Sequence, residues 1–311
     1  MAITGQFAVA DALHLPLADK SVDLVLGSPP YCDARTYGIG AQRDCAEWVE
    51  WMLSVTDEAL RVSRGAVIWV AAGVTRDWTY WPACEGLMWE WWKRGGSMFR
   101  PVYWHRLGIP GSGGEQWFRA DVEYCMCFKR PGKLPWTDNT AMGHVPAYAP
   151  GGAFANWTAN GGRANDPWNK RGRPSGIGGR TVSGEKKLGT MKAPNGQKGG
   201  DLAEYRDYSP PAIANPGTLI STGAGGGGQL GHSLAHENEA PYPEDLCGFF
   251  IRSLCPPNGL VCDPYSGSGT TVAAAMKAGR NGIGFDIRES QVKLGYRRIA
   301  GITPPLFTEA V

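Results

Sequence analysis

The hydrophobic positions of the chain follow regular patterns before residue 131. Residues 22–26 and 65–71 are short, largely apolar runs, typical of strands buried on both faces of a parallel sheet. Between these runs, apolar residues recur every three or four positions from Trp48 to Val62, and Asp44 with Glu47 is suited to open this helix. Residues 122–129 alternate in a way that predicts a strand with two unlike faces. The succession of strands and helices predicts an α/β fold.

Regular patterns disappear between about residues 131 and 235 and then return. The pattern predicts a helix over 242–254, a buried strand at 260–262, a helix ending near Gly279, a strand over 282–287 and a helix over 289–299. Roughly half of the 44 glycines fall in the intervening stretch, including the run 225–228. The sequence therefore predicts one α/β core, formed by 1–130 and 236–311 and interrupted by an insertion over 131–235.

The composition suits a protein with a sizeable buried core. The chain has 311 residues, of which 42% are hydrophobic and 19% are charged. No apolar run approaches the roughly 20 residues of a membrane span, and no basic stretch followed by an apolar one opens the chain. The eight cysteines form no CxxC pair and have no zinc spacing. We therefore expect a cytoplasmic protein with reduced thiols, no membrane association and no metal site.

The insertion carries a one-sided charge. Two tryptophans, Trp157 and Trp168, are interleaved with its basic residues, and only Asp166 and Glu185 oppose them between residues 161 and 200. The basic residues there are Arg163, Lys170, Arg171, Arg173, Arg180, Lys186, Lys187, Lys192 and Lys198. Lysine and arginine release counterions from phosphates, so one interpretation is a segment that meets a polyanion and becomes ordered on it. The other is a solvated insertion with no task of its own.

A proline turn follows the first predicted buried strand. Ser28-Pro29-Pro30-Tyr31 ends that strand because two prolines cannot continue it, and they hold a hydroxyl and an aromatic ring on a stiff turn. A plain turn with no further role is the alternative. Cys32 next to the turn is a second candidate, as a nucleophile, although no histidine lies near it in sequence.

A glycine-rich turn, DPYSGSGTT at 263–271, joins a predicted strand to a helix. Its glycines let the backbone approach a ligand closely. Val272 stands where a dinucleotide fingerprint needs a third glycine, and no GK[ST] is present for a P-loop. Asp286 ends the next strand, where a carboxylate can accept both hydroxyls of a ribose. A nucleoside without a pyrophosphate fits this pattern, and in S-adenosylmethionine (AdoMet) the sulfonium and amino groups would suit Asp263.

Together, SPPY at 28–31 and DPYSGSGTT at 263–271 resemble the motif pair of the amino-methylating DNA methyltransferases. The order of proline turn, basic insertion and glycine turn resembles the circularly permuted beta group of that family. The likeness covers about residues 7–130 and 236–300. Further matching segments are Asp11-Ala12-Leu13, Tyr103-Trp104-His105-Arg106, Arg119, 123–129, His236 and 240–246.

The resemblance implies a Rossmann-like methyltransferase fold with a mostly parallel sheet and helices on both faces. It implies a catalytic part of the core over 1–130, a target-recognition and DNA-binding insertion over 131–235, and an AdoMet-binding part over 236–311. We expect both turns to leave the carboxyl ends of adjacent parallel strands. The implied catalytic residues are Ser28, Pro29, Pro30 and Tyr31; the implied AdoMet-binding residues are Asp11, Asp263, Pro264, Tyr265, Ser266, Gly267, Gly269, Thr270 and Asp286; the implied DNA-binding residues are Arg163, Lys170, Arg171, Arg173, Arg180, Lys186 and Lys187.

The implied reaction is methyl transfer from AdoMet to an exocyclic amino group of a base flipped out of double-stranded DNA. Serine before Pro-Pro favours the first hypothesis, methylation of cytosine at N4, over the second, methylation of adenine at N6. The third hypothesis is a protein of this fold that binds DNA or AdoMet without catalysis. Protein-glutamine methyltransferases place the proline turn after the glycine turn, and cytosine-C5 enzymes need a cysteine directly after proline, where Tyr31 stands here. A homodimer and a cognate restriction endonuclease are the further partners that the resemblance suggests.

Overall fold

In the computed structural model, the described residues are 2–33, 43–108, 118–145, 213–223, 233–237 and 242–303. The chain divides into two compact units, 1–142 with 216–311, and 143–215. Residues 146–212 of the second unit lie outside the described ranges, so the predicted domain boundaries stay a prediction. No helix within the described ranges is long and apolar enough to cross a membrane.

The first unit is built on a sheet that has nine strands among the described residues. In spatial order the strands are β1 (Gly5–Val9), β11 (Asn281–Asp286), β10 (Leu260–Asp263), β2 (Val22–Gly27), β3 (Ser63–Ala71), β8 (Val122–Lys129), β7 (Val102–Leu107) and β9 (Leu219–Gly223), with β6 (Ser97–Met98) paired to β8. The first five of these strands run parallel to one another, whereas β8 runs antiparallel to β3 and to β7. The sheet is therefore mixed but mostly parallel, as predicted.

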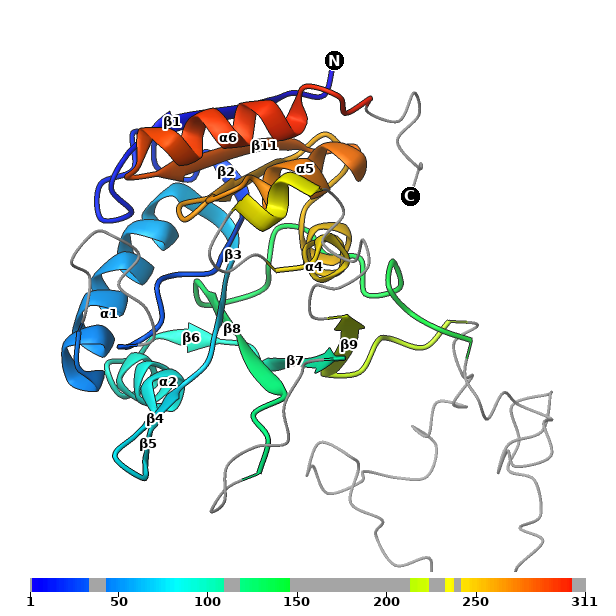
Figure 1. Ribbon diagram of the computed structural model, residues 1–311. Helices are drawn as coiled ribbons and strands as arrows, with labels where there is room; N and C mark the ends of the chain where they lie inside the picture. Colours follow the sequence, from blue (N-terminus) through cyan, green and yellow to red (C-terminus); the bar gives the residue numbers. More distant parts are fainter. Residues whose placement is uncertain are drawn as a thin grey trace, which may run out of the picture. The chain divides into compact units, whose positions relative to one another are not determined.

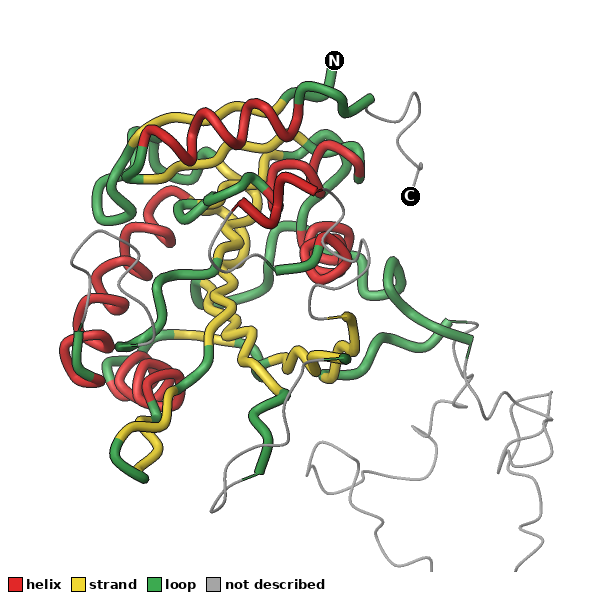
Figure 2. The backbone as a smooth tube through the Cα atoms, in the orientation of Figure 1, coloured by secondary structure: helices red, strands yellow, loops and turns green. Residues whose placement is uncertain are grey.

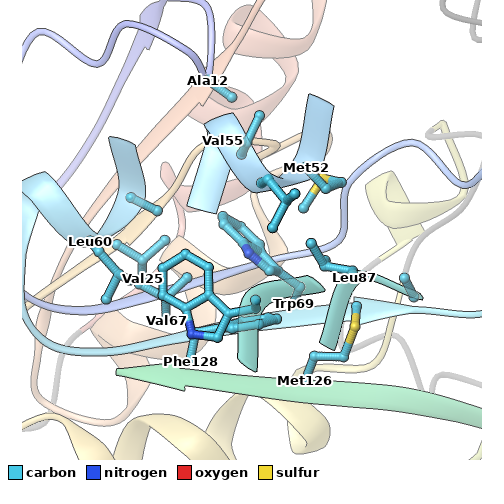
Figure 3. Packing of buried hydrophobic residues seen from close by; sticks show 14 of the residues in the cluster. Ala12, Val25, Met52, Val55, Leu60, Val67, Trp69, Leu87, Met126 and Phe128 are labelled. Atoms are coloured by element: carbon cyan, nitrogen blue, oxygen red, sulfur yellow. The ribbon is translucent and has the colours of Figure 1, made fainter. Parts of the chain in front are cut away.

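Helices cover both faces of this sheet, as Figures 1 and 2 show. On β3, Val67 and Trp69 belong to a core cluster shared with α1 (Cys45–Val62) and α2 (Ala83–Lys93) (Figure 3). Ile68, between them, belongs to a cluster on the opposite face with α4 (Glu244–Leu254) and α5 (Thr270–Lys277). A third cluster packs α6 (Glu289–Ile299) and α5 against β1. Because successive side chains of a strand point to opposite faces, a strand segment covered on both sides must be apolar throughout, which explains the sequence of β3 from residue 66 to 71.

The start of α1 follows from its first residues. The Asp44 carboxylate accepts a hydrogen bond from the Glu47 amide at 2.8 Å, and the Glu47 carboxylate accepts one from the Asp44 amide at 3.2 Å. This reciprocal pair satisfies amide groups that have no partner inside the helix. The prediction that Asp44 and Glu47 open a helix is confirmed.

Several elements were not predicted from the sequence. They are β1, the hairpin of β4 (Val74–Arg76) and β5 (Thr79–Trp81), α2, β6, β7 and β9. Over 131–235 we expected no regular structure. This expectation is wrong for two described stretches, β9 and a short 3-10 helix, Ser233–Glu237. β9 lies parallel to β7 at the edge of the sheet, and its five residues are too few to give a periodic pattern of their own.

The close approach of β2 and β3 depends on Gly65. A Cβ atom at this position would lie 1.8 Å from the backbone oxygen of Asp23, which no side-chain movement can relieve. We expect Gly65→Ala to lower the free energy of unfolding by about 3 kcal/mol or more. Gly248→Ala in α4 is the matched control, because its Cβ would meet nothing within 4 Å, and we expect it to raise the free energy by about 1 kcal/mol. Urea unfolding measures the free energy of both variants. A similar change in Gly65→Ala and Gly248→Ala would contradict the requirement for glycine at position 65.

Candidate active site

The two turns singled out in the sequence leave the same edge of the sheet. β2 and β10 are neighbours and run parallel, with Leu24 opposite Val261 and Val25 opposite Cys262. After β2 the chain passes through α1 to β3, and after β10 it passes through α5 to β11 on the other side. The direction of the connections therefore reverses between these two strands, which is where open α/β sheets bind ligands. The expectation that the turns follow adjacent parallel strands is confirmed.

The two turns are in close proximity at Gly27. A Cβ atom there would lie 2.8 Å from Oδ1 of Asp263 and 3.5 Å from Pro264. Any larger residue at the end of β2 would displace the buried carboxylate at the end of β10. Glycine at this position therefore allows the turn at 28–31 and the turn at 263–271 to approach each other closely.

The proline turn is fixed by side chains from three other elements. The indole Nε1 of Trp48 in α1 donates to the Pro30 carbonyl oxygen at 2.7 Å. The Tyr31 hydroxyl donates to Glu123 of β8 at 2.5 Å, and Glu123 forms an ion pair with Arg106 of β7 at 2.9 Å. Ser28 is half-buried and Pro29 is buried. The hydroxyl of Ser28 and the ring of Tyr31 are thus carried on a braced turn.

Sequence reasoning did not assign Glu123, Arg106 or Trp48 to the site. A signal for Glu123 was present, since it shares one face of its strand with Cys125 and Cys127. The structure buries all three side chains, with Glu123 only 5% exposed. A buried carboxylate in a strand requires partners, and here they are the tyrosine hydroxyl and the guanidinium.

The glycine turn has the backbone geometry that its sequence predicts. Gly267 and Gly269 have φ angles of 47° and 80°, in the left-handed region that favours glycine. Gly269 caps α5, and a Cβ atom on it would lie 2.7 Å from the ring of Phe7. The turn is held by two backbone amides, since Ser266 donates to the Phe285 carbonyl at 2.8 Å and Gly267 donates to Asp286 at 3.1 Å.

Asp263 lies beneath this turn and is 1% exposed. Its carboxylate accepts hydrogen bonds from the Tyr265 amide at 2.9 Å, the Thr271 hydroxyl at 2.5 Å and the Tyr242 hydroxyl at 3.2 Å. Burial raises the pKa of Asp263 to about 6, although these three donors favour the ionised form. Asp263 therefore organises the turn and places a buried carboxylate next to the end of β2.

Asp286 ends β11 on the other side of the turn and is 8% exposed. One oxygen accepts the Gly267 amide, and the other accepts the amide of Arg288 at 2.9 Å and its Nε at 3.4 Å. The oxygen that accepts the Gly267 amide therefore keeps a lone pair that can accept a ligand hydroxyl, whereas the other oxygen already accepts two hydrogen bonds. Arg288 is another residue that sequence reasoning missed.

Two polar atoms of the turn lack partners. The Tyr265 hydroxyl and the Ser266 hydroxyl are buried and form no hydrogen bond among the described residues. The Tyr265 ring lies edge-on to Trp69 and Trp51, with centroids 5.9 and 6.0 Å away. Buried polar atoms are nearly always hydrogen-bonded in native proteins, so two unmet hydroxyls on one glycine turn indicate a polar ligand there. This is the property that a nucleoside cofactor would need.

The remaining predicted residues have simpler surroundings. Asp11 is exposed, and its carboxylate accepts the Leu13 amide at 2.9 Å within its own loop. Pro264 is buried, and the buried Thr270 hydroxyl accepts a hydrogen bond from Arg298 at 2.9 Å. The seven predicted DNA-binding residues lie outside the described residues: Arg163, Lys170, Arg171, Arg173, Arg180, Lys186 and Lys187. Within the described ranges, no group of His, Cys, Asp and Glu side chains could hold a metal ion.

Cys32 does not have the properties of a nucleophile. Its side chain is fully buried in the cluster under α1. Burial raises the pKa of the Cys32 thiol to about 12, whereas a reactive cysteine needs a lowered pKa and an accessible sulfur. The site therefore offers the hydroxyl of Ser28, and not this thiol, next to the proline turn.

Comparison with known proteins gives a family match over most of the chain. The N6/N4 methyltransferase family model, described as DNA methylase, matches residues 22–297. Type II methyltransferase M.BglII of Bacillus subtilis is 22% identical over 295 residues, 92% of this chain and 66% of its own length. DNA adenine methyltransferase YhdJ of Escherichia coli is 40% identical over 57 residues, 18% of this chain and 19% of its own length. The matches thus span less than two thirds of these relatives.

Two solved structures have a similar fold. A PvuII DNA methyltransferase described as cytosine-N4-specific has a TM-score of 0.63 at 18% identity, over 97% of this chain and 89% of that one. The putative DNA modification methylase TTHA0409 of Thermus thermophilus, complexed with S-adenosyl-L-methionine, has a TM-score of 0.53 at 19% identity, over 96% and 93%. These matches agree with the predicted α/β methyltransferase fold.

The raised pKa of Asp263 predicts a pH-dependent contribution to stability. Between pH 4 and 6 the folded state keeps a proton that the unfolded state has released, so this contribution is present below pH 4 and is lost as pH rises through about 6. The full shift corresponds to about 3 kcal/mol. We expect the free energy of unfolding of the wild type, minus that of Asp263→Asn, to fall between pH 4.5 and 7.5 in urea titrations. If this difference in the free energy of unfolding did not change with pH, the raised pKa of Asp263 would be contradicted.

Proposed function

We propose that the protein, which belongs to the N6/N4 DNA methylase family, transfers the methyl group of AdoMet to the N4 amino group of cytosine in DNA. The observation that carries this proposal is the adjacency of the two turns at the ends of β2 and β10. There the Ser28–Tyr31 turn and the glycine turn leave adjacent parallel strands, with Gly27 against Asp263. A methyl donor in one turn and an acceptor base at the other would face each other across a strand spacing of about 5 Å.

The residues of the glycine turn fit AdoMet. We assign a ribose hydroxyl to the free lone pair of the Asp286 oxygen that accepts the Gly267 amide, and we assign hydrogen bonds with other polar groups of the cofactor to the unmet hydroxyls of Tyr265 and Ser266. The ionised Asp263 supplies negative charge below a cationic ligand. When bound, AdoMet supplies an electrophilic methyl group on a sulfonium. Asp11, Pro264, Gly267, Gly269 and Thr270 complete the proposed cofactor-binding set.

The proposed role of the proline turn is to prepare the target amino group. The lone pair of this nitrogen is delocalised into the ring, and two acceptors for its N–H groups would draw it towards tetrahedral geometry. We assign these acceptors to the Ser28 hydroxyl oxygen and the Pro29 carbonyl oxygen. Because Trp48 holds the adjoining Pro30 carbonyl, both acceptors sit on a backbone that does not need to reorganise during the reaction.

Tyr31 is the proposed stacking platform for the flipped base. Extrusion from the duplex requires a few kcal/mol of unstacking energy, and an aromatic face offsets part of it. The hydroxyl of Tyr31 is fixed by Glu123, and Glu123 by Arg106, so the orientation of the ring is set before DNA binds. We regard Glu123 and Arg106 as positioning residues for this ring.

Removal of the proton does not require a strong base. The end of β3, where some relatives carry an acidic residue, reads Val70-Ala71-Ala72 here. A neutral Ser28 hydroxyl is a poor base at pH 7. The methylated nitrogen is positively charged and sheds its proton readily, so water is a sufficient acceptor.

The choice of cytosine rests on Ser28, because serine before Pro-Pro favours N4 enzymes within the family. The PvuII enzyme, described as cytosine-N4-specific, has a similar fold, so the fold is compatible with this choice. The second candidate is adenine N6, favoured by the local identity with the adenine methyltransferase YhdJ. Both share the same fold, cofactor and turns, so only the product distinguishes them.

Double-stranded DNA is the proposed substrate. We assign DNA binding and target recognition to the basic insertion, through Arg163, Lys170, Arg171, Arg173, Arg180, Lys186 and Lys187. The cysteines of the described residues are all free, which suits a reducing, cytoplasmic location. A second copy of the chain and a cognate endonuclease stay predictions.

Product analysis tests the function directly. The protein is incubated with AdoMet and unmethylated DNA, the DNA is digested to nucleosides, and the products are identified by mass. We expect N4-methylcytosine. N6-methyladenine would replace the first candidate with the second, and no methylated nucleoside at all would favour a fold without catalysis.

Ser28→Ala separates chemistry from cofactor binding. We expect kcat to fall by about 100-fold or more, because one of two preorganised polar groups at the reacting nitrogen is lost. The Kd of AdoMet, measured by calorimetry, should stay within about twofold, since Ser28 lies outside the glycine turn. Ser54→Ala on the exposed side of α1 is the matched control. Loss of AdoMet binding in Ser28→Ala would contradict the role assigned to this residue.

Asp286→Ala should act mainly on the cofactor. We expect the Kd of AdoMet to rise about tenfold or more, because hydrogen bonds from the ribose to a carboxylate are lost. Asp286→Asn keeps an acceptor for the Gly267 amide, so we expect a smaller increase with a folded turn. An unchanged Kd in Asp286→Ala, with thermal stability preserved, would remove Asp286 from the cofactor site.

A further inference from the structure

The carboxylate of Asp263 is buried at a cost to stability. Burial raises its pKa to about 6, so at neutral pH the folded protein holds a charge that water would solvate better. A buried carboxylate with a raised pKa, at the edge of the sheet where ligands bind, is typical of a functional site. The side chains that hold this carboxylate are therefore candidates for a role in cofactor binding.

The two oxygens of Asp263 have different surroundings. Oδ1 accepts the Tyr265 amide at 2.9 Å and lies 2.8 Å from the position of a Cβ atom on Gly27, where the two turns approach each other. Oδ2 accepts the Thr271 hydroxyl of α5 at 2.5 Å and the Tyr242 hydroxyl at 3.2 Å. Oδ1 is therefore the oxygen next to the end of β2, and Oδ2 is the oxygen held by hydroxyl donors.

Tyr242 reaches this carboxylate from outside the glycine turn. It is buried and precedes α4, which packs with α5 in one core cluster (Figure 1). Its hydroxyl is also hydrogen-bonded with that of Thr271. Tyr242 can donate to Asp263 directly or to Thr271, which itself donates to Oδ2, so its proton stabilises the charged carboxylate in either arrangement. The ring fills the core, whereas the hydroxyl serves the carboxylate.

The charge on Asp263 depends on these donors. In the described part of the chain, the titratable groups with a charge interaction to Asp263 are Asp286 of β11, Cys247 of α4, Cys262 of β10, Tyr265 and Tyr242. The Asp286 carboxylate opposes a charge on Asp263 by repulsion. Burial raises the pKa of the two thiols and of the two phenols, so these four groups are neutral at pH 7. Hydroxyl and amide donors therefore favour the ionised form against burial and repulsion.

We propose that Tyr242 is a positioning residue for AdoMet binding: its hydroxyl holds Oδ2 of Asp263, so that the carboxylate presents a negative Oδ1 where the two turns meet. This inference rests on the proposed function, since it requires a cationic cofactor at the glycine turn. A protonated Asp263 would offer this cofactor no charge, and a carboxylate free to rotate would have to be ordered on binding. Tyr242 acts on the cofactor through Asp263.

Tyr242→Phe removes only the hydroxyl and is tested by the pH dependence of AdoMet binding. Loss of one hydrogen bond to a charged acceptor should raise the pH midpoint of binding by about 1 pH unit. The Kd of the variant should then exceed that of the wild type about 5- to 10-fold at pH 5.5 and less than about twofold at pH 8.5 in calorimetry. Titration of AdoMet itself cancels in this ratio, and a merely structural loss would weaken binding equally at every pH.

Three further variants locate the effect. Thr271→Val removes the other hydroxyl donor and should give a Kd ratio that also rises towards low pH. In an Asp263→Asn background, the effect of Tyr242→Phe should no longer depend on pH, because the titrating group is gone. Tyr124→Phe is the matched control, since its hydroxyl donates to a different carboxylate, that of Glu85 in α2, at 2.8 Å. Its Kd ratio should stay near one at every pH.

A Kd ratio of Tyr242→Phe that does not change with pH would overturn the inference, whether AdoMet binding is preserved or weakened. A pH dependence that persists in the Asp263→Asn background would also overturn it, because the hydroxyl would then act through another group. If Tyr242→Phe did not fold, Thr271→Val would decide by the same ratio. A folded wild type that binds no AdoMet at any pH would instead overturn the proposed function.

Discussion

The parallel pairing of β2 with β10 is the contact on which the rest of the site depends. It joins two segments that lie at opposite ends of the chain, with Leu24 and Val25 opposite Val261 and Cys262. Asp23 fixes the amino end of the pair, since its carboxylate accepts the Leu260 amide at 2.9 Å and the Arg64 guanidinium at 2.7 Å. With the amino ends of the two strands aligned, their carboxyl ends lie side by side, and the two turns approach each other at Gly27 and Asp263.

Buried carboxylates then give each turn its shape. Asp263 and Asp286 hold the glycine turn through hydroxyl and amide donors, and Glu123 holds the ring of Tyr31. In a low-dielectric interior a buried carboxylate must be hydrogen-bonded or ion-paired, and these bonds make both turns rigid. The same requirement makes the unmet hydroxyls of Tyr265 and Ser266 informative, because they are the polar atoms that a ligand would complete.

Much of the fold and part of the candidate site could be predicted from the sequence, for physical reasons that differ between elements. β3 and α1 were predictable because burial on both faces, or on one helix face, imposes a periodic pattern. β9 was not, since five residues gain their stability only from pairing with β7. The location of both turns at one edge of the sheet followed from their positions after buried parallel strands, whereas their adjacency was expected from the family resemblance. The bond from Trp48 to Pro30 did not, because a tertiary contact has no signal in local sequence.

The most direct test of one shared site is a crystal structure with sinefungin, an AdoMet analogue that carries an amine in place of the transferable methyl group. We expect a ribose hydroxyl of the analogue to contact Asp286 and its amine to face Ser28 across the gap between β10 and β2. An analogue bound elsewhere, or one whose amine points away from the proline turn, would contradict the claim that the two turns form a single methyl-transfer site.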